Sequence, residues 1–298
     1  MRFLIAGASG FLGSRLRSSL LGAGHDVTSL VRRAPAGGEA RWDPYSAALD
    51  PDLVEKADVV VNLAGSPTLG NPHSQSWADN LRTSRVTTTR VLADAIAASS
   101  RRPAFLAGNG ISYYGDHGAE PVTEASGTHG DAFLTSVTLD WQAATETAAD
   151  AGARVCVLRT APVMDRSSAP LRQLMLLFKA GLGGPLGNGE QYFPMISLED
   201  WVAAVTFAAE HDEVAGPVNL CCSETPTNAE FTHELARLVH RPAFFRVPAA
   251  VLRPAAGRMA PELLGSVRAV PRVLLDAGFR FADPTVSDVL ASATRHAS

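Results

Sequence analysis

The chain has 298 residues, of which 46% are hydrophobic and 19% charged, and its formal net charge is −4. This length and composition predict a globular protein with one large domain, alone or with a smaller second one. The charge gives no basic footprint for nucleic acid, and no apolar run approaches the roughly 20 residues that span a membrane. Three cysteines without CxxC spacing indicate reduced thiols and a cytoplasmic protein.

Short apolar runs alternate with amphipathic segments through the first half of the chain. Strands are predicted at residues 2–6, 25–33, 57–65, 103–110 and 153–161, and helices at 12–22, 77–99 and 132–151. Strands that alternate with helices form parallel sheets covered on both faces. The expected fold is therefore α/β, a Rossmann-type doubly wound parallel sheet.

The second half of the chain has a different sequence pattern. An apolar helix is predicted at 171–184, followed by a glycine-rich loop at 184–194. Capping-box spacing, with a carboxylate three residues after a Ser or Thr, predicts two further helices at 197–210 and 228–240.

This change of sequence pattern predicts two lobes. Residues 1–165 form the Rossmann domain, and residues 166–298 form a smaller C-terminal lobe that would hold the substrate. The segment 197–222 is expected to return to the first lobe, so the boundary is not a single point in the chain.

The stretch AGASGFLGSRL, residues 6–16, follows the first strand and opens the first helix. Gly7 permits the tight turn, Gly10 lets the backbone approach a pyrophosphate, and Gly13 lets the helix pack on the strand. Free N–H groups at the helix start attract an anion. The loop therefore predicts a dinucleotide site, with a glycine-rich structural turn as the alternative. Its binding residues are Gly7, Ser9, Gly10, Phe11, Leu12 and Gly13.

The second strand ends in Arg32 and Arg33, where NAD-binding chains carry Asp or Glu for the ribose hydroxyls. A carboxylate repels a 2′-phosphate, whereas a guanidinium binds it through two hydrogen bonds. One charge-assisted hydrogen bond contributes about 1.5–3 kcal/mol, which gives about ten- to a hundred-fold preference. The pair predicts NADP (NADPH) rather than NAD as the cofactor, with a solvated basic turn as the alternative.

Several motifs resemble those of one known group: GASGFLG, NLAG at 62–65, SR at 84–85 and YYGD at 113–116. The group is the extended short-chain dehydrogenase/reductase superfamily, and more closely its atypical branch, the NAD-dependent epimerase/dehydratase family. Later segments are similar to that branch as well: GLGGPLGNGEQYFP, GPVNLCCSETPTNAEF and VPRVLLDAGFRFADPT. The last of them resembles the short C-terminal domain of unknown function in this branch. The resemblance is specific for fold and cofactor, and weak for substrate.

The resemblance implies a two-lobed enzyme fold with NADP lying across the C-terminal edge of the sheet. Arg32 would bind the adenosine phosphate. Asn80 and Arg85, on the helix after the 66–76 loop, would reach the cofactor, although an ordinary charged helix surface explains them too. Three residues would line the path from adenine to ribose, and a fourth would approach the nicotinamide; these are Leu63, Ala64, Gly65 and Val163.

The proton-transfer residues of the superfamily are missing. Its chemistry uses Tyr-x-x-x-Lys on one helix, where the lysine lowers the pKa of the phenol. None of the four tyrosines has a lysine four residues later, and the helix expected to carry the pair reads SVTLDWQAATE. The serine of the superfamily falls at Asn109-Gly110. We expect Tyr114 as a replacement proton donor and Asn109 to orient a carbonyl or a water; tyrosines that only pack the loop are the alternative.

Two functions are compatible with these residues. The first is an NADP-dependent oxidoreductase or epimerase-like enzyme for an unknown small carbonyl or sugar-like substrate, because hydride transfer depends mainly on positioning. The second is a non-catalytic NADPH-binding sensor or regulatory protein. We expect a monomer or homodimer that binds neither nucleic acid nor a membrane. We expect no metal either, since no histidines have zinc-ligand spacing.

Overall fold

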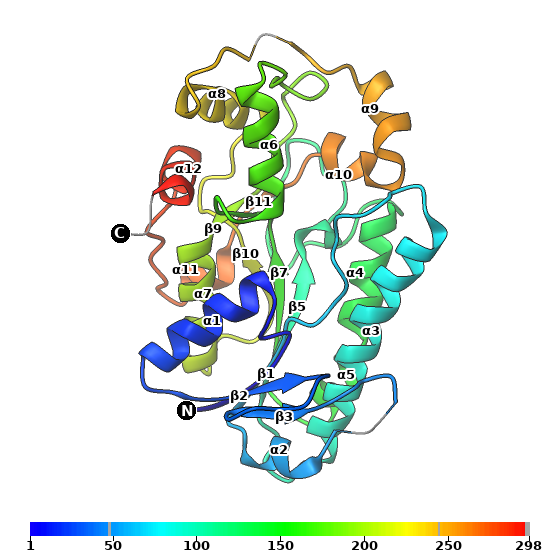
Figure 1. Ribbon diagram of the computed structural model, residues 1–298, viewed down its shortest axis with the longest axis vertical. Coiled ribbons are helices and arrows are strands. Elements are labelled where there is room, and N and C mark those ends of the chain that lie inside the picture. Colours follow the sequence, from blue (N-terminus) through cyan, green and yellow to red (C-terminus); the bar gives the residue numbers. More distant parts are fainter. Residues whose placement is uncertain (47–48, 244, 296–298) are drawn as a thin grey trace. The chain divides into compact units, whose positions relative to one another are not determined.

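The computed structural model describes residues 1–46, 49–243 and 245–295, and its contacts divide the chain into two compact units (Figure 1). Unit 1 comprises Met1–Asn109, Val137–Leu158 and Ala204–Val218. Unit 2 comprises Gly110–Ser136, Arg159–Ala203 and Asn219–Ser298. The chain therefore passes repeatedly between the units, and each unit is built from three separate segments.

A seven-stranded sheet has the strand order β10-β7-β5-β4-β1-β2-β3. Its strands are β1 (Arg2–Ala6), β2 (Asp26–Val31), β3 (Glu39–Arg41), β4 (Val59–Asn62), β5 (Ala104–Gly110), β7 (Val155–Thr160) and β10 (Gly216–Leu220). β1 pairs in parallel with β2 and β4, β2 with β3, and β4 with β5. The predicted doubly wound parallel sheet is confirmed.

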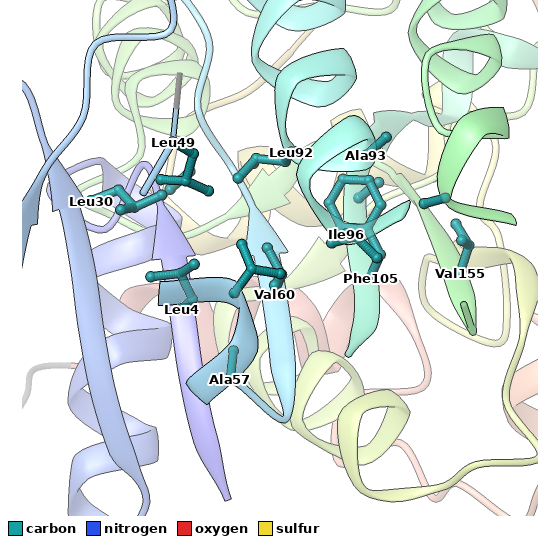
Figure 2. Packing of buried hydrophobic residues seen from close by; sticks show 14 of the residues in the cluster. Leu4, Leu30, Leu49, Ala57, Val60, Leu92, Ala93, Ile96, Phe105 and Val155 are labelled. Carbon is teal, nitrogen blue, oxygen red and sulfur yellow. The ribbon is translucent and has the colours of Figure 1, made fainter. Parts of the chain in front are cut away.

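One face of the sheet is buried under α3 (Gln75–Ala98), as Figure 2 shows. Successive residues of a strand point to opposite faces, and the side chains on this face include the fully buried Leu4, Val60 and Phe105. Ile96 of α3 packs into the same cluster. Because both faces of a parallel sheet are covered, β1 and β4 are continuous apolar runs rather than alternating ones.

The helix α1 (Phe11–Gly22) covers the opposite face. It connects β1 to β2, whereas α3 connects β4 to β5 on the other side of β1. Parallel crossovers are right-handed, so connections that leave β1 and β4 in opposite directions place their helices on opposite faces. Leu16 and Leu20 of α1, one turn apart, are buried accordingly.

The first half of the chain differs from the prediction in several short elements and in one divided helix. The helix predicted at 132–151 is two helices, α4 (Phe133–Ala143) and α5 (Glu146–Asp150). Thr145 interrupts it, because its amide and its hydroxyl both donate to the carbonyl of Gln142, at 2.9 and 2.8 Å, and tighten the turn. β3 and α2 (Pro51–Lys56) are too short to give a periodic signal.

Unit 2 combines two small parallel sheets, β8–β9 and β6–β11, with helices. Its elements are η1 (Ile111–Tyr113), β6 (Pro121–Val122), β8 (Val163–Met164), α6 (Ala169–Lys179), β9 (Ile196–Ser197), α8 (Asn228–Leu238), α9 (Ala249–Ala256), η2 (Gly257–Met259), α10 (Ala260–Leu264), β11 (Arg268–Ala269), α11 (Arg272–Asp276) and α12 (Val286–Thr294); α7 (Leu198–Glu210) passes from unit 2 into unit 1. Phe178 of α6, Phe231 of α8 and Val289 of α12 pack in one apolar core. Among the residues described, no helix combines the length and apolar character needed to cross a membrane.

Helix α6 ends at Lys179, several residues before the predicted end, and Gly181 accounts for the difference. The φ angle of Gly181 is +75°, a left-handed conformation that favours glycine. The amides of Gly181 and Leu182 donate to the carbonyls of Phe178 and Leu177, both at 2.9 Å, and satisfy the end of the helix.

The two predicted capping boxes have different outcomes. The box at Thr227 forms completely and starts α8. At Ser197 only half of it forms: the Ser197 hydroxyl accepts from the amide of Asp200 at 3.1 Å. The Asp200 carboxylate instead accepts from the amides of Ala282 and Asp283, at 2.8 and 2.9 Å. This carboxylate therefore joins the start of α7 to the C-terminal part of unit 2.

Asp58 provides a test of the electrostatics at the start of the sheet. Its carboxylate lies 2.7 Å from Nη2 of Arg2 and 3.0 Å from Nη2 of Arg101. The hydrogen bond from Arg2 lowers the pKa of Asp58 to about 2. A lowered carboxyl pKa stabilises the fold above the unfolded-state pKa, and this contribution is lost as the pH falls through the folded-state value.

We therefore expect Asp58→Asn to lower the free energy of unfolding by about 1 kcal/mol at neutral pH, a value that allows for partial exposure of the pair. The deficit should shrink as the pH falls from about 4 to about 2. Thermal unfolding at a series of pH values measures it. Asp52→Asn is the control, because its pair with Lys56 is largely exposed. A deficit of constant size across this range would contradict the assignment.

Candidate functional site

The strands β1, β2 and β4 end together at one edge of the sheet in unit 1, and β5 continues three residues further, to Gly110. Ala6, the last residue of β1, lies opposite Leu30 of β2 and Asn62 of β4, and Asn62 lies opposite Ala107 of β5. The segments that follow these strands therefore start side by side. β2 and β3 lie on one side of β1, and β4 and the later strands on the other. Doubly wound sheets bind ligands at such a reversal.

The three glycines of the 6–16 loop have separate tasks. Gly7 has a φ of +83°, and a Cβ there would lie 2.6 Å from the carbonyl carbon of Leu63, behind β4. A Cβ at Gly13 would overlap the carbonyl oxygen of Gly7. At Gly10 the nearest atom would be 3.3 Å away, and the residue is exposed. Gly13 is therefore required by the packing of the loop itself and Gly7 by the backbone of Leu63, while Gly10 leaves its backbone open to a ligand.

The start of α1 presents its amides without a competing group. Gly10 is the N-cap and offers no side chain to them, and the first turn contains no acidic residue. Ser9 and Gly10 are exposed, and Phe11 and Leu12 are half-buried. The partial positive charge of the helix end is therefore not neutralised within the helix, which fits a phosphate-binding position.

The two arginines after β2 are not equivalent. Arg33 donates two hydrogen bonds to the carboxylate of Glu39, at 2.7 and 2.6 Å, and holds the pKa of Glu39 below its usual value. Arg32 is exposed, and its guanidinium donates no hydrogen bond to the residues described. Arg33 already has an anion as partner, so Arg32 is the guanidinium that an external phosphate would meet.

Asn62 holds the segment behind β4, and the sequence prediction missed it. Its side-chain amide donates to the hydroxyl of Thr89 at 2.8 Å, and its side-chain oxygen accepts from the amide of Ala64 at 3.0 Å. Trp141 donates to the same Thr89 hydroxyl at 2.8 Å. This buried network fixes the path of the Leu63–Gly65 segment. The signal available in the sequence was the asparagine of the NLAG motif.

Arg85 and Asn80 lie on α3 beside the loop that follows Gly65. Arg85 donates to the carbonyl of Ser66 at 3.1 Å and to the hydroxyl of Thr68 at 3.0 Å. Burial lowers the pKa of Arg85 to about 10. Asn80 is exposed, and its backbone carbonyl accepts from the Ser66 hydroxyl at 3.3 Å. Both residues shape this loop, and their contact with a cofactor stays a prediction.

Tyr114 is fully buried in unit 2. Its hydroxyl donates to the side-chain oxygen of Asn219 at 2.7 Å and accepts from Arg159 at 2.8 Å. Burial raises the pKa of Tyr114 to about 12. These contacts give the tyrosine a packing role, which is the alternative that the sequence left open, and its role as a proton donor stays a prediction.

A buried polar network that the sequence did not indicate surrounds Tyr114. The guanidinium carbon of Arg159 lies 3.5 Å from the centre of the Tyr113 ring. Glu124 accepts from the amides of Asn219 and Arg272, at 3.0 and 3.1 Å, and burial raises its pKa. The network connects segments of unit 2 that are distant in the sequence, so no local pattern reveals it.

Two further predicted residues are buried, in different units. The side-chain amide of Asn109, at the end of unit 1's part of β5, donates to the carbonyl of Thr138 at 3.1 Å. Val163 is part of β8 in unit 2 and lies opposite Ile196 of β9. Their proposed tasks at a substrate carbonyl and at the nicotinamide stay predictions.

The strand order, the reversal beside β1 and the glycine loop define a Rossmann-type α/β protein. Residues 3–221 match the model of the NAD dependent epimerase/dehydratase family, and the chain belongs to that family. Residues 247–293 match a domain of unknown function, DUF1731. Both matches confirm the resemblance on which the sequence prediction drew.

Similar proteins cover nearly the whole chain. The epimerase family protein Mb2239 of Mycobacterium bovis is 40% identical over 292 residues, which are 97% of this chain and 96% of that protein. The mouse epimerase family protein SDR39U1 is 34% identical over 295 residues, 97% of this chain and 98% of that one. The crystal structure of human epimerase family protein SDR39U1 (isoform 2) with NADPH superposes with a TM-score of 0.88 at 31% identity, over 98% of this chain and 99% of that one.

The glycine loop can be tested with two substitutions in the same helix. Gly13→Ala forces a methyl group against the backbone of Gly7 and is expected to cost about 1–3 kcal/mol of stability. Gly22→Ala, with nothing within 4 Å of the added carbon, should be neutral or stabilising by up to about 1 kcal/mol. Denaturant unfolding measures both. Equal stability of the two variants would contradict the packing role of Gly13.

The network around Tyr114 can be tested in the same way. Tyr114→Phe leaves Arg159 and Asn219 without their shared hydroxyl and is expected to lower the free energy of unfolding by about 1–3 kcal/mol. Tyr113→Phe is the matched control, because the Tyr113 hydroxyl makes no hydrogen bond to the residues described, and it should be near neutral. Thermal denaturation compares them, and an unaltered Tm for Tyr114→Phe would rule the network out as a source of stability.

Proposed function

We propose that the chain binds NADP(H) at this edge of unit 1 and is an NADP-dependent oxidoreductase or epimerase-like enzyme for a small carbonyl or sugar-like substrate. The observation that carries the proposal is Arg32, an exposed guanidinium at the end of β2, beside the exposed start of α1. The human relative whose structure contains NADPH supports the choice of cofactor.

Each part of the edge fits one part of this cofactor. The amides at the start of α1 would bind the pyrophosphate, with Gly10 leaving the space for it. Arg32 would bind the 2′-phosphate through two hydrogen bonds. The Leu63–Gly65 segment, fixed by Asn62, would line the adenine and ribose. When bound, NADPH supplies the hydride for the reaction.

We also propose a division of labour along the chain. Residues 1–165, with 197–222, would serve the cofactor, and residues 166–298 would serve the substrate. A reducing, cytoplasmic environment is part of the proposal, and the buried free thiols support it; these are Cys156, Cys221 and Cys222.

A non-catalytic NADPH sensor is the second candidate. The absence of Tyr-x-x-x-Lys and the fully hydrogen-bonded hydroxyl of Tyr114 favour it. Stopped-flow absorbance of NADPH with a panel of carbonyl compounds separates the two functions. Oxidation by any member supports the enzyme. NADPH that binds but stays reduced throughout, with a partner protein recovered only in its presence, supports the sensor.

Arg32→Ala is expected to weaken NADPH binding about ten- to a hundred-fold and to leave NADH binding unchanged, because only NADPH carries the 2′-phosphate. Arg33→Ala is the matched control and should have a smaller effect, since Arg33 is paired with Glu39. Isothermal titration calorimetry measures all four affinities. Equal losses in the two variants, or tighter binding of NADH than of NADPH by the unsubstituted protein, would contradict the proposal.

A further inference from the structure

A cavity of about 570 Å³ lies in unit 1, between the loop that joins β3 to α2 and the last turns of α3. This volume is within the range of pockets that hold small organic ligands. The described residues that line the cavity include none of the glycine loop, of the Leu63–Gly65 segment or of the arginine pair after β2. The cavity is therefore separate from the edge where we propose cofactor binding, although both belong to the same unit.

Most of the cavity wall is apolar and belongs to the core of the unit. Leu49, from the loop, is 5% exposed and packs in the core cluster of Figure 2. Val91 and Ala95, one turn apart on α3, pack against the same cluster. Pro44 and Pro51 also line the cavity, and each proline fixes a backbone angle of the chain. The wall is therefore held in place by the fold, so the cavity exists before a ligand binds.

The loop also presents an aromatic ring at the cavity. Tyr45 lines it and is 54% exposed. The carboxylate of Asp43 accepts from the amide of Tyr45 at 3.1 Å and from the hydroxyl of Ser46 at 2.9 Å, and these bonds fix the turn. The backbone therefore holds Tyr45 beside the cavity, and the exposed surface of its side chain is available to a ligand.

The charged groups of the cavity wall are two carboxylates, Glu55 and Asp94, and no lysine or arginine is among its described residues. Glu55 accepts from the amide and the hydroxyl of Ser100, at 2.7 and 3.0 Å, and these bonds hold its pKa below the usual value. Glu55 is therefore ionised at neutral pH. Asp94 is exposed, and within the part of the chain that the structure describes it accepts no hydrogen bond and forms no ion pair. The Asp94 carboxylate is therefore available to a ligand.

We propose that this cavity binds a small organic ammonium ion with an aromatic body. The Asp94 carboxylate accepts charge-assisted hydrogen bonds from the ammonium group. The apolar wall covers the body of the ligand, and the ring of Tyr45 contacts that body or the cation. The two carboxylates disfavour anions, phosphates among them. This inference goes beyond the proposed function, because the ligand is neither the cofactor nor the substrate proposed above.

Three ligands with the same indole body test the charge requirement. Tryptamine carries an ammonium group, tryptophol a neutral hydroxyl, and indole-3-propionate a carboxylate. In isothermal titration calorimetry with the full chain, we expect tryptamine to bind about three- to tenfold more tightly than tryptophol, and indole-3-propionate to bind most weakly. Added salt should weaken the binding of tryptamine but not that of tryptophol. Equal affinities for tryptamine and tryptophol, or no binding of tryptamine at millimolar concentrations, would overturn the proposal.

Asp94→Asn removes the charge and keeps the size of the side chain. We expect it to weaken tryptamine binding about three- to tenfold, to the level of tryptophol, and to leave tryptophol binding unchanged. Asp79→Asn is the matched control, because Asp79 is an exposed carboxylate on the same helix that does not line the cavity. It should leave both affinities unchanged. If the two substitutions have equal effects, the ammonium group does not bind Asp94 and the assignment fails.

Ala98→Trp tests whether the ligand occupies the cavity rather than another part of the surface. Ala98 is the last residue of α3, lines the cavity and is exposed, so a larger side chain there fills the cavity without displacing the core. Binding of tryptamine should fall about tenfold or more, with an unchanged Tm. Unaltered binding of tryptamine to this variant contradicts the proposal. None of these measurements requires NADPH, so a negative result leaves the proposed function standing, and loss of the proposed function leaves this site standing.

Discussion

The close approach of two backbones, at Gly7 behind β1 and at Leu63 behind β4, is the constraint on which the candidate site depends. It leaves no room for a side chain at Gly7, so the chain turns at once and α1 starts at the edge of the sheet. Asn62 fixes the backbone after β4, because its side-chain oxygen accepts a hydrogen bond from the amide of Ala64. The two loops are thus positioned by the sheet and by each other before any ligand is present, which is the rigid support that a precise binding site requires.

The positive charge at this edge depends on which of the neighbouring arginines forms an ion pair with a carboxylate. Glu39 of β3 pairs with Arg33, whereas Arg32 forms no ion pair within 4 Å among the residues described and interacts only at longer range with Asp43. Two adjacent residues of the same type therefore have different tasks, one in the fold and one toward solvent. Glu39, on the strand two places from β1, determines which arginine is available, and this difference arises from geometry rather than from residue type.

Much of the fold follows from local sequence signals, and most of the site follows from the glycine loop. The strands are apolar runs because both of their faces are buried, and the loop glycines are identified by their spacing between a strand and a helix. The complete capping box at Thr227 is a local pattern as well. Features that depend on distant partners were not predictable. The Asp200 carboxylate does not complete the capping box at Ser197, because it accepts hydrogen bonds from the amides of Ala282 and Asp283 instead.

The same reason explains which site residues the sequence did not reveal. Arg159 and Asn219 contact the Tyr114 hydroxyl from strands that are 45 and 105 residues away in the chain. Such pairs have no periodicity and no spacing to read. They are visible only once the topology has brought the segments together.

The interleaving of the two units has a consequence for how the protein is made. Unit 2 takes its last segment from Asn219 to the C-terminus, and β6 finds its partner β11 only there. During synthesis, the edge of β6 therefore stays unpaired until almost the entire chain has left the ribosome. A premature stop anywhere before β11 would leave that edge open, and the shortened chain would be a substrate for chaperones and proteases rather than a smaller folded protein.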